Sequence, residues 1–147
     1  MRRVSSLRRS ERGTALVESA VVIPLLLFVC TGILEFGRAY QTWQVLTNAA
    51  REGARVAVLP GVGDDAVRTR VEDYMTSGYL SRADDADIDI TRNNAIAIGA
   101  TTATASRVTV NYPFEFMVLQ PIARMVVGET GVGGPLTMSA SALMRNE

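Results

Sequence analysis

The chain has 147 residues, enough for one modest domain and a long helix but not for two full domains. It has no histidine and one cysteine, which excludes histidine-based acid–base or metal chemistry and any intramolecular disulfide. Its fifteen basic residues, all arginines, balance fifteen acidic residues. No phosphate-binding loop or metal-ligand spacing is present. The composition therefore argues against an enzyme, against catalytic or metal-binding residues, and against a cofactor.

An apolar run follows a basic N-terminus. Residues 1–12 contain five arginines, and residues 15–36 are long and apolar enough to span a bilayer. Because basic residues favour the cytoplasmic side, we expect a basic cytoplasmic leader at 1–13, disordered or lying on the inner membrane face, and an extracytoplasmic head. A cleaved secretory signal is less favoured, since Glu35 and a helical pattern follow the run. Nucleic-acid binding is disfavoured because no aromatic residues accompany the arginines.

Helical periodicity continues beyond the apolar run. We therefore predict one long helix over 14–59, kinked at Pro24 and ended by the breakers at 60–63. Its second half carries an apolar seam at three- and four-residue spacing, on which either the chain's own head or a neighbouring subunit would pack. The seam consists of Phe36, Ala39, Trp43, Leu46, Ala50, Gly53 and Ala57.

Residues 60–147 are predicted to form a small α+β head with an antiparallel sheet and one short helix at 64–77, closed by Gly78. Alternation of apolar and polar residues predicts strands at 87–91, 95–99, 107–114 and 136–142. The expected connections are a turn at 93–94, a polar link at 101–105, a loop or short helix at 116–127 and a flexible link at 128–134. An acidic cluster lacks the spacing of an EF-hand, so a solvated strand edge is preferred. The cluster is Asp84, Asp85, Asp87 and Asp89.

Three blocks of sequence resemble the TadE-like family, pilin-like minor components of bacterial tight-adherence (Flp) pilus systems. They are GTALVESAVVIPLLL at 13–27, GILEFGR at 32–38 and LTNAAREGAR at 46–55. The blocks cover less than a third of the chain, but their number and order make the resemblance specific. It implies nothing about individual residues of the head.

The resemblance implies a prepilin-type leader that a membrane aspartyl peptidase removes after Gly13, leaving Thr14 as the new N-terminus. Glu18, the fifth residue of the product, would serve in assembly; Ser19 follows it, where the family usually has an aromatic residue. The implied partners are the prepilin peptidase, other pilin-like subunits, the inner-membrane assembly platform and membrane lipid. The implied location is the bacterial inner membrane, or the pilus after assembly. Neither nucleic acid nor a small-molecule substrate is called for.

Cleavage would leave a positive α-amine at Thr14, which could pair with Glu18 of a neighbouring subunit inside a filament. The expected function is therefore that of a minor pilin or pseudopilin. The alternative is a single-pass membrane-anchored protein whose extracytoplasmic head binds a partner and which does not polymerise. Such a protein would need no cut at Gly13.

Overall fold

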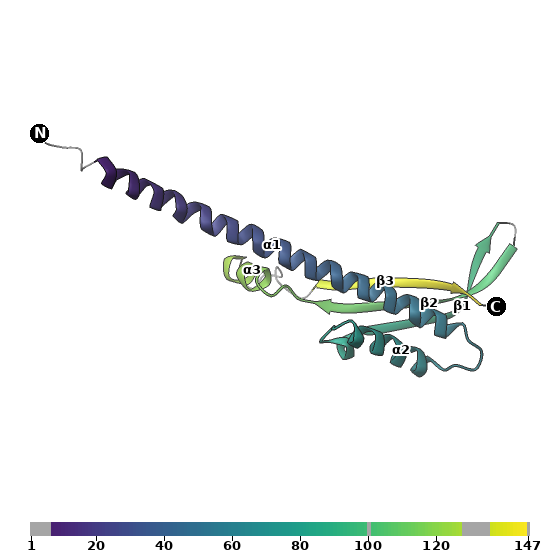
Figure 1. Cartoon of the computed structure of the whole chain (residues 1–147). Coiled ribbons are helices and arrows are strands. Elements are labelled where there is room, and N and C mark those ends of the chain that lie inside the picture. The colour runs from purple at the N-terminus through teal and green to yellow at the C-terminus, as the bar shows by residue number, and fades with distance from the viewer. Residues whose placement is uncertain (1–6, 100, 128–135, 147) are drawn as a thin grey trace, which may run out of the picture.

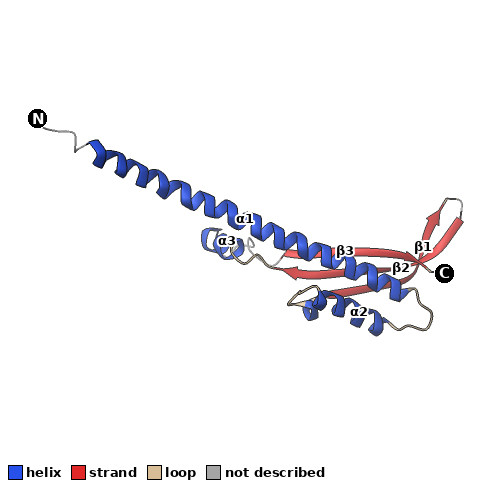
Figure 2. Ribbon diagram, viewed as in Figure 1, coloured by secondary structure: helices blue, strands red, loops and turns tan. Residues whose placement is uncertain are grey.

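The computed structural model describes residues 7–99, 101–127 and 136–146. One long helix leads into a small sheet that carries shorter helices (Figures 1 and 2). The elements are α1 (Leu7–Ala57), α2 (Asp64–Ser77), the 3₁₀ turn η1 (Ala83–Asp85), β1 (Asp87–Ile98), β2 (Thr101–Phe114), α3 (Leu119–Val127) and β3 (Leu136–Arg145). This order confirms the expected α+β fold, a long apolar helix followed by an antiparallel-sheet head. The predicted link at 128–134 lies outside the described residues.

Helix α1 is 51 residues long, which corresponds to about 75 Å. It begins at Leu7, so the predicted helix start at Thr14 is wrong, and residues 7–12 are helical instead of disordered. The physical reason is that these residues include no strong helix breaker, and Gly13 inside a helix costs only about 1 kcal/mol relative to alanine. The helix also continues through Pro24, where we expected a kink, as one uninterrupted ribbon (Figure 1).

The C-terminal end of α1 is held by an arginine from the sheet. Arg92 donates hydrogen bonds to the carbonyl oxygens of Ala57 (2.8 Å) and Val62 (2.9 Å) and forms an ion pair with Asp64 (2.7 Å). Its guanidinium thus satisfies a carbonyl that the helix leaves unpaired at its end. One side chain therefore joins β1 to the end of α1, to the connecting loop and to the start of α2.

The sheet has the order β1-β2-β3, and both strand pairs are antiparallel. Along β2, inward-facing residues alternate with polar residues on the other face, as a half-buried strand requires. In the centre of the sheet Val110 stands opposite Ile88 on one side and Ala140 on the other. The second half of α1 and all of α2 cover this inner face (Figure 2). The core includes Leu46, Ala49, Ala50 and Ala54 from α1, Val67, Val71 and Met75 from α2, and Ile88, Val108, Val110, Tyr112 and Phe114 from the strands.

The predicted turn at 93–94 is wrong, because β1 continues through these residues to Ile98. Asn93 has a positive φ of 57°, which asparagine tolerates well, but it forms a β-bulge instead of a reversal. The bulge places Arg92 and Asn93 opposite the single residue Ser106. The chain reverses at Gly99, with φ 61°, so the expected polar link at 101–105 is instead the first part of β2.

Gly78 follows α2 as predicted, but it does not supply the left-handed residue that often ends a helix. Its φ is −82°, and the next residue, Tyr79, has the positive φ of 62°. A Cβ atom on Gly78 would lie 2.5 Å from Cγ1 of Val45. This glycine is therefore required by the close approach of α2 to α1.

Gly53 lies where α1 approaches both α2 and the sheet, and it generates the first prediction. A Cβ atom there would lie 2.5 Å from Cγ2 of Val71 and 3.2 Å from Cγ1 of Val108. Gly53→Ala gains about 1 kcal/mol of helix propensity but should lose about 1–3 kcal/mol by overpacking. We therefore expect a lower thermal midpoint for the full chain in detergent micelles.

Gly37→Ala is the matched control, because a Cβ atom at this exposed position in the same helix would have no neighbour within 4 Å. It should leave the thermal midpoint unchanged or raise it. If both alanine variants raised the midpoint equally, the close approach at Gly53 would be contradicted.

Candidate functional site

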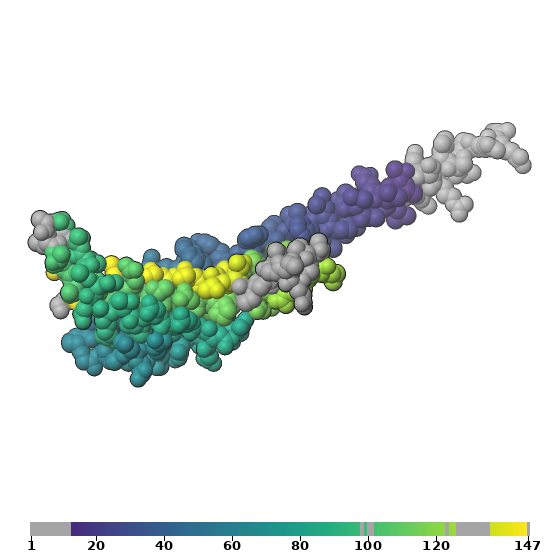
Figure 3. Space-filling view, turned by 180° about the vertical axis from the view of Figure 1, so that it is seen from behind, coloured from purple at the N-terminus to yellow at the C-terminus, as the bar shows by residue number. Residues whose placement is uncertain are grey.

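The first half of α1 extends away from the head (Figure 3), and its apolar side chains are exposed. From Leu16 to Phe36 the exposed large apolar side chains have relative exposures between 49% and 75%. A soluble monomer rarely exposes so large a contiguous apolar surface. The segment is long and apolar enough to cross a membrane, and the rest of the chain buries none of its most apolar part. It therefore fits a membrane anchor.

The predicted processing residues lie at the beginning of this exposed segment. Gly13, Thr14 and Glu18 are all exposed, and no atom lies within 4 Å of the position that a Cβ atom on Gly13 would take. Thr14 and Glu18 are one helical turn apart and thus share a face. Ser19, beside them, donates a hydrogen bond to the carbonyl oxygen of Ala15 (2.8 Å). Within the described part of the chain, the Glu18 carboxylate forms no hydrogen bond or ion pair.

The predicted seam divides into a buried distal part and a more exposed proximal part. Leu46, Ala50, Gly53 and Ala57 are buried against α2 and the sheet, and Ala39 is half-buried. Phe36 and Trp43 are largely exposed, although the ring of Phe36 contacts Phe116 of the head. The physical reason is that a repeat of 3.5 residues drifts by about 20° per heptad on a straight helix.

A buried carboxylate lies where α1 first meets the head. Glu35 is only 4% exposed, and it accepts a hydrogen bond from the backbone N–H of Val118 (2.6 Å). Its other oxygen forms an ion pair with Arg38 (3.1 Å). Both carboxylate oxygens are thus paired, which offsets the cost of burying the charge. Glu35 connects α1 to the residue that directly precedes α3.

A chain of charged groups extends from Glu35 across the surface. The Arg38 guanidinium donates to the carbonyl oxygen of Glu115, and its central carbon lies 4.9 Å from the ring centroid of Phe114. The Glu115 carboxylate is 3.2 Å from Arg82, which forms a second ion pair with Asp85 (2.8 Å). The hydrogen bond to Asp85 raises the pKa of Arg82. Exposed pairs of this kind mainly fix geometry and contribute little to stability.

Aromatic packing supports the same contact. The ring of Phe116 lies 6.0 Å from that of Phe36 on α1 and 5.2 Å from that of Phe114 on β2, in edge-to-face arrangements. We call the set Glu35, Arg38, Arg82, Glu115 and Phe116 the junction. The junction joins three segments that are far apart in the sequence.

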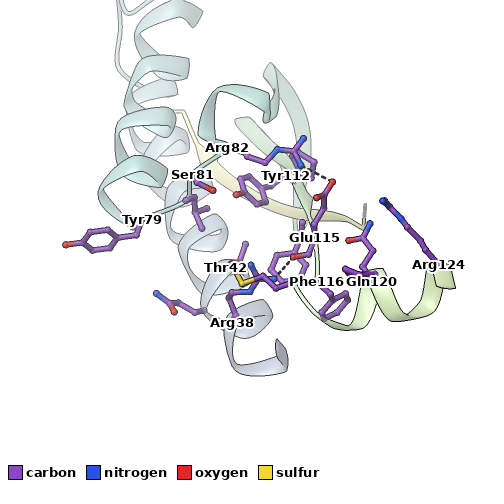
Figure 4. Close-up of a pocket in the computed structure, with 17 residues that line it drawn as sticks. Arg38, Thr42, Tyr79, Ser81, Arg82, Tyr112, Glu115, Phe116, Gln120 and Arg124 are labelled. Atoms are coloured by element: carbon purple, nitrogen blue, oxygen red, sulfur yellow. Dashed lines mark hydrogen bonds and ion pairs between the residues drawn. The ribbon is translucent and has the colours of Figure 1, made fainter. Parts of the chain in front are cut away.

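An open pocket of about 560 Å³ lies beside the junction, between α1, the end of α2 and the segment before α3 (Figure 4). Arg38, Arg82 and Glu115 form part of its wall, together with the exposed Tyr79. Because the charges of these residues already pair with one another or with Glu35 and Asp85, the pocket presents no unpaired charge from this group. Its geometry favours a structural contact over a ligand site.

Two of the four residues of the acidic cluster interact with side chains outside the cluster. Asp85 pairs with Arg82, and Asp87 accepts a hydrogen bond from the side chain of Asn111 (3.3 Å). Asp84 and Asp89 are exposed. In the ranges that the structure describes, no group of three acidic or cysteine residues is arranged to hold a metal ion.

The sequence alone did not identify the junction. Glu35 and Arg38 are three residues apart, a spacing at which opposite charges on a helix pair, and that spacing was the available signal. The hydrogen-bond partner Val118 is 83 residues further along the chain, and no periodicity reveals such a contact. The single cysteine, Cys30, is exposed on the apolar segment and forms no disulfide.

Comparison with known families gives one match. Residues 13–55 match the model of the family described as TadE-like protein, which confirms the resemblance found in the three blocks of sequence. The matched region contains Gly13, Glu18, Glu35 and Arg38, and the buried seam residues Leu46, Ala50 and Gly53. No curated protein and no solved structure matches the chain. The match supports a protein associated with tight-adherence pili, and it does not extend to the head beyond residue 55.

The junction generates the second prediction. Glu35→Ala removes the acceptor of the Val118 amide and the partner of Arg38, and hydrogen bonds to charged groups are worth about 1.5–3 kcal/mol. We expect faster amide hydrogen exchange at Val118 and through the start of α3, measured by mass spectrometry on the full chain in detergent micelles.

Asp89→Ala is the matched control, since it removes an exposed carboxylate that is not part of the junction. It should leave the exchange of residues 116–120 unchanged. Unaltered exchange at Val118 in Glu35→Ala would show that this carboxylate does not hold the segment before α3.

Proposed function

Since residues 13–55 match the TadE-like family, we propose that this chain is a minor pilin or pseudopilin of a bacterial tight-adherence pilus. A prepilin peptidase removes residues 1–13, and the protein then contributes to pilus assembly. The observation that carries the proposal is the family match on a helix whose first half exposes many large apolar side chains. Such a surface needs either lipid or other apolar helices around it.

The arrangement of the chain supports membrane insertion with the head outside the cytoplasm. The five arginines of residues 1–12 precede the apolar segment, as the positive-inside rule requires for a cytoplasmic N-terminus. From Ala15 to Phe36 the helix rises about 30 Å, close to the thickness of the hydrocarbon core. The inner membrane of a bacterium is the membrane in which such a protein would reside before assembly.

Exposure at Gly13 supports cleavage by a peptidase. Among the side chains that the structure describes from residue 13 onward, none lies within 4 Å of a Cβ atom placed on this glycine, although the glycine lies inside a helix that begins at Leu7. The peptidase would have to unwind this end of α1, where glycine weakens the helix. Cleavage removes the five leader arginines and creates a positive amine at Thr14.

Glu18 supports assembly through charge pairing. Its carboxylate is exposed and forms no ion pair within the described chain, so it is available to a neighbouring subunit. Inside a filament of packed apolar helices, an unpaired carboxylate would be costly. The α-amine of a neighbouring Thr14 is a partner of opposite charge, and their attraction would set the axial position of one subunit against the next.

The alternative, an anchored binding protein that does not polymerise, gains no specific support from the head. The pocket beside the junction is open, and the charges of Arg38, Arg82 and Glu115 in its wall are paired. The alternative also gives no role to Gly13 and Glu18. It predicts a protein that keeps residues 1–13.

The third prediction concerns processing. When the full chain is co-expressed with its prepilin peptidase, intact mass spectrometry should show a product smaller by the mass of residues 1–13, and Gly13→Ala should abolish this change. Gly32→Ala, the same substitution further along the helix at a site without close neighbours, should be processed normally. An unchanged mass for the wild-type chain would exclude the prepilin assignment.

The fourth prediction concerns assembly. Glu18→Ala should insert into the membrane as the wild type does but should impair pilus assembly, because the Thr14 amine loses its partner. Membrane fractionation and electron microscopy of the cell surface measure the two effects. Ser19→Ala is the neighbouring control and should assemble normally. Normal numbers of pili in cells that carry Glu18→Ala would contradict the charge-pairing role.

A further inference from the structure

Helix α3 lies at the end of the head that faces the apolar half of α1 (Figure 3). Two contacts hold its beginning there, the hydrogen bond from the Val118 N–H to Glu35 and the edge-to-face contact of Phe116 with Phe36. In the close-up, α3 runs across the direction of α1 and not along it (Figure 4). A helix that crosses a membrane-spanning helix in this way lies along the plane of the membrane.

The segment that contains α3 exposes large apolar side chains. Met117 is 72% exposed and Met125 is 86% exposed, while Val118 and Ile122 are each 44% exposed. Residues 116–127 carry a single charge, Arg124, and no acidic residue. An amphipathic segment with apolar side chains on the outside and no acidic residue is suited to a lipid surface.

The position of α3 along α1 coincides with the end of the apolar segment. Glu35, which binds the residue before α3, lies about 30 Å beyond Thr14, roughly the thickness of the hydrocarbon core. Tyr40 and Trp43 follow on α1 as an exposed aromatic pair, with ring centroids 6.2 Å apart. Tyrosine and tryptophan concentrate at the lipid–water interface. The end of the apolar segment, the aromatic pair and α3 therefore lie at about the same position along the axis of α1.

We propose that α3 lies in the lipid–water interface beside the membrane-spanning part of α1, with Met117, Ile122 and Met125 inserted among the lipids. The partner is the outer leaflet of the bilayer that holds the anchor. This inference rests on the membrane anchoring in the proposed function and adds a second membrane contact to it. The junction then fixes both contacts relative to each other, so that the head stands on the membrane in one orientation.

Lipid is favoured over a second protein copy as the partner of α3, because the apolar surface of α1 continues into the segment that contains α3. The segment that leads into α3 contacts Phe36 through the ring of Phe116, and the exposed residue Met117 follows directly. Phe36 is the last residue of an apolar surface that must already be covered by lipid before assembly. A bilayer around α1 therefore reaches α3 without any additional binding event. Contact between α3 segments of two copies would instead require oligomerisation.

Depth-dependent fluorescence quenching tests the proposal on the full chain in vesicles of phosphatidylcholine and phosphatidylglycerol. The vesicles carry nitroxide lipids with the quencher either near the headgroup or near the end of the acyl chain. A thiol-reactive fluorophore is attached at one of three positions, each as the only cysteine. These are native Cys30, Met125→Cys in a Cys30→Ser chain, and Thr102→Cys in a Cys30→Ser chain. Thr102 is exposed near the end of β2 that is remote from the anchor, and Met125 is so exposed that its replacement should not disturb folding.

We expect the fluorophore at Cys30 to be quenched most by the deep nitroxide, because this residue lies within the apolar segment. The fluorophore at Met125→Cys should be quenched most by the shallow nitroxide, several-fold more than the one at Thr102→Cys. If Cys30 is quenched but Met125→Cys behaves like Thr102→Cys, the interfacial position of α3 is overturned while the anchor stands. If Cys30 is not quenched, the anchor itself fails, and with it the inference.

A second arm distinguishes lipid from protein contact. Chains carrying the fluorophore at Met125→Cys are mixed in plain vesicles with chains carrying a nitroxide at the same position. Unchanged fluorescence on mixing supports contact with lipid. Strong quenching on mixing, without quenching by the shallow nitroxide lipid, would assign α3 to a contact between copies and overturn the proposal.

Discussion

The two halves of α1 require different surroundings, yet they belong to one uninterrupted helix. The first half exposes apolar side chains along its whole length, and the second half packs against α2 and the sheet. A rigid helix transmits the orientation of either half to the other, so the anchor and the head cannot reorient independently. The boundary between the two halves is at Glu35, a buried carboxylate at the end of the apolar segment. The burial of that carboxylate is tolerated because the Val118 amide and Arg38 pair with both of its oxygens.

The head is organised by its contacts with the second half of α1. Gly53 lets the helix approach Val71 and Val108 more closely than any side chain would allow, and Gly78 does the same for α2 beside Val45. At the far end, Arg92 binds the last carbonyl of the helix and the first residue of α2. The inner face of the sheet, in turn, packs against α1 and α2. A change in the position of α1 would therefore alter the packing of α2 and of the sheet.

Long elements with consistent periodicity were predictable from the sequence, because many residues independently favour the same structure. This holds for α1 as a whole, for α2 and for the alternating core of β2. The boundaries and the junction were not predictable for specific physical reasons. Asn93 favours a positive φ equally in a turn and in a bulge, and only the pairing of the flanking residues with β2 decides between them. The exposure of Phe36 and Trp43 follows from the drift of a 3.5-residue repeat on a straight helix. Glu35 and Arg92 act on partners that are distant in sequence, which local patterns cannot reveal.

The N-terminal residue of the mature protein, isolated from the cells that produce it, tests the proposed role most directly. Processing of a prepilin predicts Thr14 as that residue, on a chain that keeps its apolar segment and carries Glu18 one helical turn after its N-terminus. A mature chain that begins at Met1, or at any residue beyond Phe36, would contradict the role of this helix as an anchor that later joins a filament.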